Sequence, residues 1–169
     1  MKTTFYMVRH GQPDWDWAEA MRFYGPCSAY MPLTPLGVEQ IEHTACDSQL
    51  RGASFILASP YTRTMQSAQI LSRRLDLPVT VEWDLHEWLY DRDMRGDLPT
   101  PEERFGREDM TRCFFFYMEH DELTGEDNCE TAAVIAERVL ACLRRYDGQA
   151  EKIIVVCHEG VIRSVTGMK

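Results

Sequence analysis

The chain has 169 residues, of which 44% are hydrophobic and 27% charged, so one domain covering residues 1–169 can bury a core without disulfides or metals. The formal net charge of −9 argues against a nucleic-acid-binding protein, because such proteins carry a basic surplus or a basic stripe. No apolar run is long enough to span a bilayer, and the amino terminus has no secretory signal. We therefore expect a cytoplasmic protein with no membrane partner.

The cysteines favour free thiols over disulfides. No pair has the C-x-x-C spacing, and a chain with an ample apolar core needs no covalent cross-links. We therefore expect unpaired, mostly buried thiols at all six positions, which are Cys27, Cys46, Cys113, Cys129, Cys142 and Cys157. No cluster of His, Cys and Asp has metal-ligand spacing, so neither a metal nor another cofactor is predicted.

The first third of the chain predicts a strand, a long loop and a helix. Residues 5–8 form a short apolar run that is typical of a buried strand. A loop is expected over residues 12–33, which are rich in proline, with a helical turn within residues 17–23. Thr34 followed by Pro35 predicts a helix with Thr34 as its N-cap.

The middle of the chain repeats this order. Residues 55–58 predict a second buried strand. Ser59 and Pro60 repeat the pattern of a cap followed by proline, and apolar residues at helical spacing extend from there to Leu75. Residues 78–81 predict a third strand.

The last third is less regular at first. Residues 84–99 are rich in charged and aromatic side chains, and a capping box at 100–103 predicts a helical region that reaches about His120. Apolar residues on one face predict a helix over 131–146. The apolar run at 153–157 is the clearest strand of the chain.

This alternation of strands and helices predicts the fold. It is typical of a three-layer α/β/α sandwich with a mostly parallel central sheet. Ligands of such folds bind at the carboxyl ends of the strands. His10, the segment 59–63 and His158 each follow a predicted strand, so we expect them to meet at one edge of the sheet.

Five segments occur in the order of the motifs of the histidine phosphatase (phosphoglycerate-mutase-like) superfamily, and each resembles its motif. The motifs are R-H-G, L-[ST]-x-x-G, S-x-x-x-R-[TA]-x-x-[ST]-A, E-S-x6-R and V-x-H-x-G. The matching segments are residues 9–11, 33–37, 59–68, 130–138 and 155–160. The resemblance extends over nearly the whole chain and implies a phosphoglycerate-mutase-like fold.

The same residues suit phosphoryl chemistry. A neutral imidazole is a competent nucleophile near pH 7, so we predict that His10 attacks phosphorus, with a backbone carbonyl holding its other ring nitrogen as N–H. Arg9 and Arg63 have planar guanidinium groups that suit phosphate oxygens, and Arg63 is expected in the first turn of a helix, whose amino end favours anions. His158 would donate to the transferring group, and Gly11 is assigned to phosphate binding with the two arginines.

The resemblance also implies a carboxylate after the third strand that protonates the leaving group and then activates water. The segment 84–88 fits this position, and we select Glu87. Asp84, Asp91 and Asp93 are close in sequence and remain possible in its place.

Several other residues have two interpretations. Glu130 either faces the pocket or caps its helix. Exposed positions or satisfied buried positions are expected for the histidines without a motif, which are His43, His86 and His120. Three aromatic residues either line a substrate mouth or pack within their loop, namely Trp15, Trp17 and Tyr24.

The chain departs from the family pattern at two places. Asp16 takes the position of an asparagine that normally helps to bind phosphate, and a carboxylate there repels a dianion unless it points away or is protonated. The sequence ends 11 residues after His158, where family members usually continue with a segment that completes the sheet. We expect an exposed sheet edge there, which allows a homodimer.

These observations predict a phosphatase that acts on a small phosphorylated metabolite through a phosphohistidine on His10. A cofactor-dependent phosphoglycerate-type mutase would use the same residues. The resemblance implies that such mutases have longer chains, with extra segments that close over the site and exclude water. This chain is short by comparison, so hydrolysis is favoured over the mutase reaction. A non-catalytic domain that keeps the fold and binds phosphorylated ligands or a protein partner is the third hypothesis.

Overall fold

The computed structural model describes residues 2–23, 25–89 and 130–167. Within them, four parallel strands form one sheet in the order β1-β4-β2-β3. Their bounds are Thr4–Arg9 for β1, Ile56–Ala58 for β2, Val79–Val81 for β3 and Lys152–Cys157 for β4. β1 and β3 are the edges of this described sheet, and a homodimer through either edge stays a prediction. The helical region expected between residues 100 and 120 lies outside the described residues.

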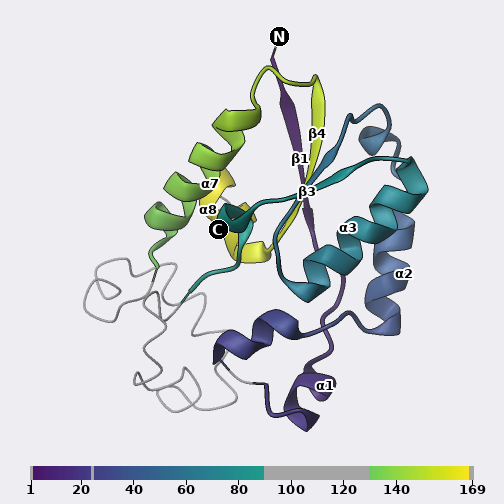
Figure 1. Ribbon diagram of the computed structural model, residues 1–169, viewed down its shortest axis with the longest axis vertical. Helices are drawn as coiled ribbons and strands as arrows, with labels where there is room; N and C mark the ends of the chain where they lie inside the picture. Colours follow the sequence, from purple (N-terminus) through teal and green to yellow (C-terminus); the bar gives the residue numbers. More distant parts are fainter. Residues whose placement is uncertain (1, 24, 90–129, 168–169) are drawn as a thin grey trace.

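Helices cover both faces of the sheet (Figure 1). Two of them, α2 (Pro35–Thr44) and α3 (Thr62–Leu75), pack together on one face. The opposite face carries α7 (Ala132–Tyr146) and α8 (Glu159–Thr166). The three-layer sandwich with a parallel sheet is therefore confirmed.

The alternation of side chains along β4 explains why the sheet needs two helical layers. Ile154 and Val156 belong to the core beneath α2 and α3. Ile153, Val155 and Cys157 belong to the core beneath α7 and α8. All five side chains are fully buried, as expected for a central parallel strand with apolar residues on both faces.

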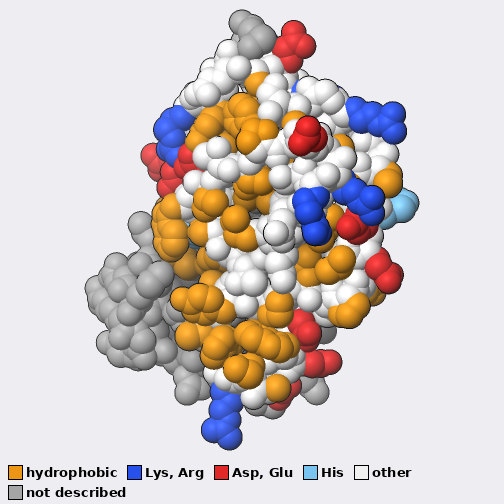
Figure 2. Space-filling model, turned by 45° about the vertical axis from the view of Figure 1, so that its right-hand side comes forward, with side chains coloured by type: hydrophobic (Ala, Val, Ile, Leu, Met, Phe, Trp, Pro, Cys, Tyr) orange, Lys and Arg blue, Asp and Glu red, His pale blue; other side chains and the backbone are white. Residues whose placement is uncertain are grey.

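The segment expected to be a loop contains two short helical elements. These are α1 (Trp15–Ala20) and the 3₁₀ helix η1 (Gly25–Tyr30). Two further 3₁₀ turns, η2 and η3, occupy Ser48–Leu50 and Trp83–Leu85. Figure 2 shows hydrophobic side chains gathered at the lower end of the molecule, where α1 and η1 lie in Figure 1. None of the helices in the described ranges is both long and apolar enough to cross a membrane.

Of the four predicted helix starts, two are correct, one is wrong, and the fourth, at residues 100–103, lies outside the described residues. Thr34 Oγ1 accepts the Gly37 N–H at 2.9 Å, and Thr131 caps α7 in the same way. The third prediction was wrong, because α3 begins at Thr62 and Ser59 does not cap it. The Ser59 N–H instead extends the sheet by donating to the Val156 carbonyl at 3.0 Å, and its hydroxyl contacts a histidine.

The described cysteines are all free thiols. Cys142 and Cys157 are buried, as predicted, but Cys27 and Cys46 are exposed. The expectation of mostly buried thiols therefore holds for only half of them. Cys113 and Cys129 lie outside the described residues.

Two glycines join the loop after β1 to the start of α2. A Cβ on Gly11 would lie 2.2 Å from the Gly37 carbonyl oxygen, and a Cβ on Gly37 would lie 2.4 Å from the Gln12 carbonyl oxygen. Both obstacles are backbone atoms, so neither can move aside cheaply. The close approach fixes the chain directly after His10.

We therefore expect Gly37→Ala to lower the free energy of unfolding by about 1–3 kcal/mol, because the added methyl overpacks two backbones. Urea unfolding followed by circular dichroism measures this change. Val38→Ala, at the next and exposed position of the same helix, should change it by less than about 0.5 kcal/mol. Equal effects of the two substitutions would contradict the assigned packing.

Candidate active site

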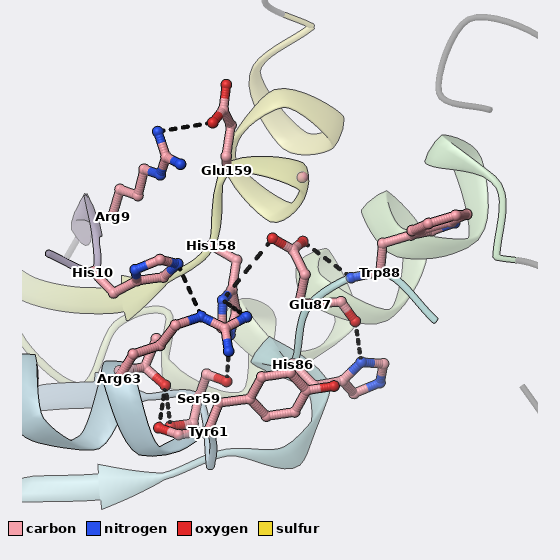
Figure 3. A network of polar contacts seen from close by, with 12 residues as sticks. Arg9, His10, Ser59, Tyr61, Arg63, His86, Glu87, Trp88, His158 and Glu159 are labelled. Carbon is pink, nitrogen blue, oxygen red and sulfur yellow. Dashed lines mark hydrogen bonds and ion pairs between the residues drawn. The ribbon is translucent and has the colours of Figure 1, made fainter. Parts of the chain in front are cut away.

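The strand register brings three polar residues to one edge of the sheet. Arg9 pairs with Cys157, and Ala58 pairs with Val156, so the residues that follow these strands emerge side by side. They are His10, Ser59 and His158. The His10 N–H donates to the Cys157 carbonyl at 3.1 Å, which continues the ladder between β1 and β4. The convergence predicted from the sequence is therefore confirmed (Figure 3).

Arg63 lies in the first turn of α3, as predicted, and its guanidinium joins the two histidines. Its Nε donates to His10 Nε2 at 3.1 Å, and its Nη2 donates to His158 Nδ1 at 3.3 Å. Its Nη1 donates to the Ser28 carbonyl of η1 at 3.1 Å. The Tyr61 ring lies 5.0 Å from the guanidinium carbon, within the range of a cation–π contact. The Arg63 side chain is thus buried, at 6% exposure, and these contacts hold it in one orientation.

The hydrogen bonds of His10 fix its tautomer. Because arginine can only donate, His10 Nε2 accepts and carries a lone pair. His10 Nδ1 lies 2.7 Å from the Gly11 carbonyl oxygen, so it holds the proton and donates it there. This is the backbone carbonyl contact that the sequence predicted. Burial, helped by the positive charge of Arg63, lowers the pKa of His10 to about 3, so the ring is neutral at pH 7.

His158 is completely buried beside this pair. Its Nε2 lies 2.8 Å from Ser59 Oγ, and its Nδ1 faces Arg63. Burial, and then the Arg63 charge, hold the pKa of His158 well below its usual value. The two histidine rings meet edge to face, with their centroids 5.2 Å apart.

Glu87 is the carboxylate nearest to this group among the described residues. Its Oε2 lies 3.9 Å from His158 Nδ1, and its Oε1 accepts the Trp88 N–H at 3.0 Å. The side chain is 21% exposed. Burial raises the pKa of the Glu87 carboxyl, although the Trp88 amide and the Arg63 charge act against this. A carboxyl with a raised pKa can hold a proton nearer neutral pH and then give it up, as acid–base catalysis requires.

A buried ion pair holds the segment that carries Glu87. Arg138 Nε donates to Glu130 Oε1 at 2.7 Å, and both side chains are largely buried. Arg138 Nη1 also donates to the Asp84 carbonyl at 2.6 Å, while Glu130 Oε2 accepts the Leu89 N–H at 2.9 Å. The interpretation of Glu130 as a helix cap is therefore wrong, because Thr131 is the cap of α7. Glu130 instead holds the segment 84–89 through Arg138 and the Leu89 N–H.

The structure does not bring the remaining predicted residues equally close to His10. The guanidinium of Arg9 points to Glu159, at 2.8 Å, and its side chain is 55% exposed (Figure 3). The Gly11 N–H donates to Ser67 Oγ at 3.3 Å. Asp16 is exposed in the first turn of α1, and within the described ranges no hydrogen bond or ion pair joins it to the site. The phosphate-binding roles of these three residues stay predictions.

Asp84, which could have served in place of Glu87, faces a different partner. Its carboxylate contacts Arg145 at 3.1 Å. Asp84 also forms, with Glu82 and Cys142, the one group of described residues close enough to share a metal ion, a grouping that the sequence spacing did not suggest. Arg145 pairs with both of these carboxylates, so its guanidinium already offsets part of their negative charge. Asp91 and Asp93 lie outside the described residues.

The histidines without a motif occupy ordinary positions. His43 is exposed on α2. His86 is buried, but its Nδ1 has a partner in the Glu87 carbonyl at 2.7 Å. His120 lies outside the described residues.

The three aromatic residues with two interpretations differ in their surroundings. Trp17 packs against Phe23 within its own loop, whereas Trp15 is 60% exposed. Tyr24 lies outside the described residues.

Two contacts of the site were not predicted from the sequence. The Ser59 hydroxyl was assigned to a helix cap, although its place in the S-x-x-x-R pattern was a signal that it belongs with Arg63. The Ser28 carbonyl is a backbone group in a segment expected to be a loop, and no sequence signal indicated its contact with Arg63.

Comparisons with known sequences and structures show which proteins this chain resembles. The sequence profile of the histidine phosphatase superfamily (branch 1) matches residues 5–168. A protein named probable phosphoglycerate mutase GpmB, from Yersinia pestis (strain Pestoides F), is 32% identical over 109 residues. The match covers 62% of this chain and 48% of that protein, so the chain spans about half the length of this relative.

Two solved structures share the fold. YhfR of Bacillus stearothermophilus has a TM-score of 0.71 at 20% identity, over 98% of this chain and 78% of that one. A mycobacterial glucosyl-3-phosphoglycerate phosphatase has a TM-score of 0.66 at 21% identity, over 95% of this chain and 76% of that one.

The lowered pKa of His10 predicts how stability depends on pH. The unfolded chain takes up a proton at His10 below about pH 6.5, whereas the folded protein does so only near pH 3, so acid favours unfolding between these values. Relative to His10→Asn, the wild-type protein should lose up to about 1.4 kcal/mol of stability per pH unit as the pH falls through this window. Urea unfolding at pH 6.5, 5.5 and 4.5 measures the difference, and parallel curves for the two proteins would contradict the assigned burial.

Glu87 predicts an effect of the opposite sign. Because its pKa is raised on folding, its unfavourable contribution grows as the pH rises above the usual value of 4.5. Glu87→Gln should therefore be more stable than the wild-type protein at pH 8, by a margin that narrows at pH 5. Thermal unfolding at the two pH values tests this. Glu39→Gln, exposed on α2, is the matched control and should show no such margin.

Proposed function

Because the chain belongs to the histidine phosphatase superfamily (branch 1), we propose that it hydrolyses small phosphomonoesters through a phosphohistidine on His10. The observation that carries this proposal is the hydrogen bond from Arg63 Nε to His10 Nε2. It puts a neutral ring nitrogen with a lone pair beside a buried cation that suits phosphate oxygens. A nucleophile and an anion-binding group therefore share one small space.

In the proposed first step, the guanidinium of Arg63 turns its donors from the histidines to the oxygens of the incoming dianion. This frees the lone pair on His10 Nε2, which attacks phosphorus as the bond to the ester oxygen breaks. Arg63 and His158 stabilise the charge on the transferring group. Glu87 protonates the leaving alkoxide, and its raised pKa supports this role.

In the second step, water attacks the phosphorus of the phosphohistidine. Glu87, now a carboxylate, takes a proton from that water, and the bond between phosphorus and His10 Nε2 breaks. The products are inorganic phosphate and a neutral His10. Both steps use groups of this chain alone, so the proposal includes no metal.

A mutase of the phosphoglycerate type is the second candidate. The name of the Yersinia pestis relative favours it, and a mutase uses the same phosphohistidine. The difference lies in the second step, where the phosphoryl group returns to substrate and not to water. The third candidate is a non-catalytic domain that binds phosphate, for which the exposed Asp16 and Arg9 are compatible observations.

One experiment separates these candidates. The protein is incubated with phosphomonoesters in the presence of EDTA, and both phosphate release and acid-labile phosphoprotein are measured. Release with a transient label supports the phosphatase. A persistent label with transfer to a phosphoglycerate supports the mutase, and neither signal supports the binding domain.

We expect His10→Ala to lower turnover by about 10³-fold or more, because it removes the nucleophile. The label should vanish with it. His43→Ala, which changes an exposed histidine of α2, should keep wild-type turnover and labelling. Wild-type activity in His10→Ala would exclude the mechanism.

A further inference from the structure

Ser59 holds its hydroxyl in a fixed place beside His158. The residue is completely buried and directly follows β2. Its N–H donates to the Val156 carbonyl at 3.0 Å, and its carbonyl accepts the Thr64 hydroxyl at 2.9 Å. With the backbone bonded on both sides, Ser59 Oγ stays 2.8 Å from His158 Nε2.

The direction of this hydrogen bond follows from the other side of the ring. Arginine can only donate, so the nitrogen that faces Arg63, His158 Nδ1, has a lone pair while that contact lasts. A neutral imidazole has one N–H, which must then be on Nε2. Ser59 Oγ therefore accepts from the ring in this arrangement. The low pKa of the buried ring agrees with the neutral form.

A bound phosphoryl group requires His158 Nδ1 to donate a hydrogen bond, whereas Arg63 requires it to accept one. Phosphate oxygens of a dianion only accept, so the ring nitrogen that faces them must carry a proton. The groups facing His158 are the His10 ring, the Tyr61 ring, Arg63 and Glu87. A second positive charge on the buried ring would be repelled by Arg63 at 3.3 Å. A neutral ring with its proton on Nδ1 avoids that cost if its other nitrogen finds a donor.

We propose that Ser59 is the positioning residue that lets His158 reverse its tautomer when a phosphoryl group enters the site. While Arg63 contacts the ring, His158 Nε2–H donates to Ser59 Oγ. When the phosphoryl group is bound, His158 Nδ1–H donates to its oxygen, and the Ser59 hydroxyl turns to donate to Nε2. The Nε2 proton passes to the Ser59 oxygen, the original hydroxyl proton of Ser59 leaves to solvent, and Nδ1 takes up one proton from solvent, so the charge of the ring does not change. A hydroxyl can fill both roles because it donates and accepts.

This inference rests on the proposed function only in that the anion is a phosphoryl group. Its test therefore uses binding without turnover. Imidazole ¹⁵N chemical shifts and two-bond ¹H–¹⁵N couplings are recorded for the ¹⁵N-labelled protein, first without phosphate and then saturated with inorganic phosphate. The His158 signals are assigned with His158→Asn.

We expect the Nε2–H pattern without phosphate and the Nδ1–H pattern with it. A pattern that does not change on saturation, or protonation of both nitrogens, would overturn the proposal. Loss of turnover in His10→Ala is scored separately, so failure of the phosphatase proposal can be distinguished from failure of this one.

Substitution gives a second readout. Ser59→Ala should abolish the tautomer change and lower kcat/KM by about 10-fold to 100-fold, because it removes one hydrogen bond to the ring. Ser59→Thr keeps a hydroxyl and should recover part of the loss. Ser72→Ala removes a hydroxyl hydrogen bond near the other end of α3, and it should leave kcat/KM and the His158 signals unchanged. A tautomer change that persists in Ser59→Ala would also overturn the assigned role.

Discussion

The site depends on one buried guanidinium, which no carboxylate of the described residues contacts directly. Arg63 donates to His10 Nε2, His158 Nδ1 and the Ser28 carbonyl, and these three acceptors are all neutral. Within the described part of the chain, no ion pair balances its charge. A buried cation whose direct contacts are all neutral is unfavourable, and a phosphate dianion at this position would relieve the cost. Burial, and then the same charge, keep both histidines neutral, so Arg63 supports both the proposed nucleophile and the proposed anion site.

This arrangement sets activity against stability. His10 and His158 are buried without charge, which makes the folded state sensitive to acid, while the raised pKa of the half-buried Glu87 carboxyl makes it less stable as the pH rises. Burial disfavours the charged form of each of these three side chains, so each lowers the stability of the fold over part of the pH range. The Arg138–Glu130 pair and the close contact of Gly11 with Gly37 hold the surrounding backbone in place. Contacts of the backbone around the site therefore hold its residues in place despite their unfavourable burial.

Much of this could be predicted from the sequence, and the failures have a common physical cause. The apolar runs at 5–8 and 153–157, the cap at Thr34 and the helix over 131–146 depend on neighbouring residues, so local patterns located them. The start of α3 depends on a strand and a histidine that are distant in sequence, and Ser59 was therefore misread as a cap. The two residues that flank His10, Arg9 and Gly11, were assigned to the anion, but the structure engages them with Glu159 and Ser67. Tertiary partners of this kind leave no periodic trace in the sequence.

The register of the sheet explains why so few residues are needed to build the site. β4 lies between β1 and β2, and in a parallel sheet all three strands end at the same edge. The pairing of Arg9 with Cys157 and of Ala58 with Val156 sets His10, His158 and Ser59 within one step of the same level. A slip of one residue between β4 and its neighbours would move His158 out of line with His10 and Ser59. The packing of β4 between β1 and β2 thus sets the spacing between His10, His158 and the Ser59 hydroxyl, and the geometry of the site follows from the packing of the core.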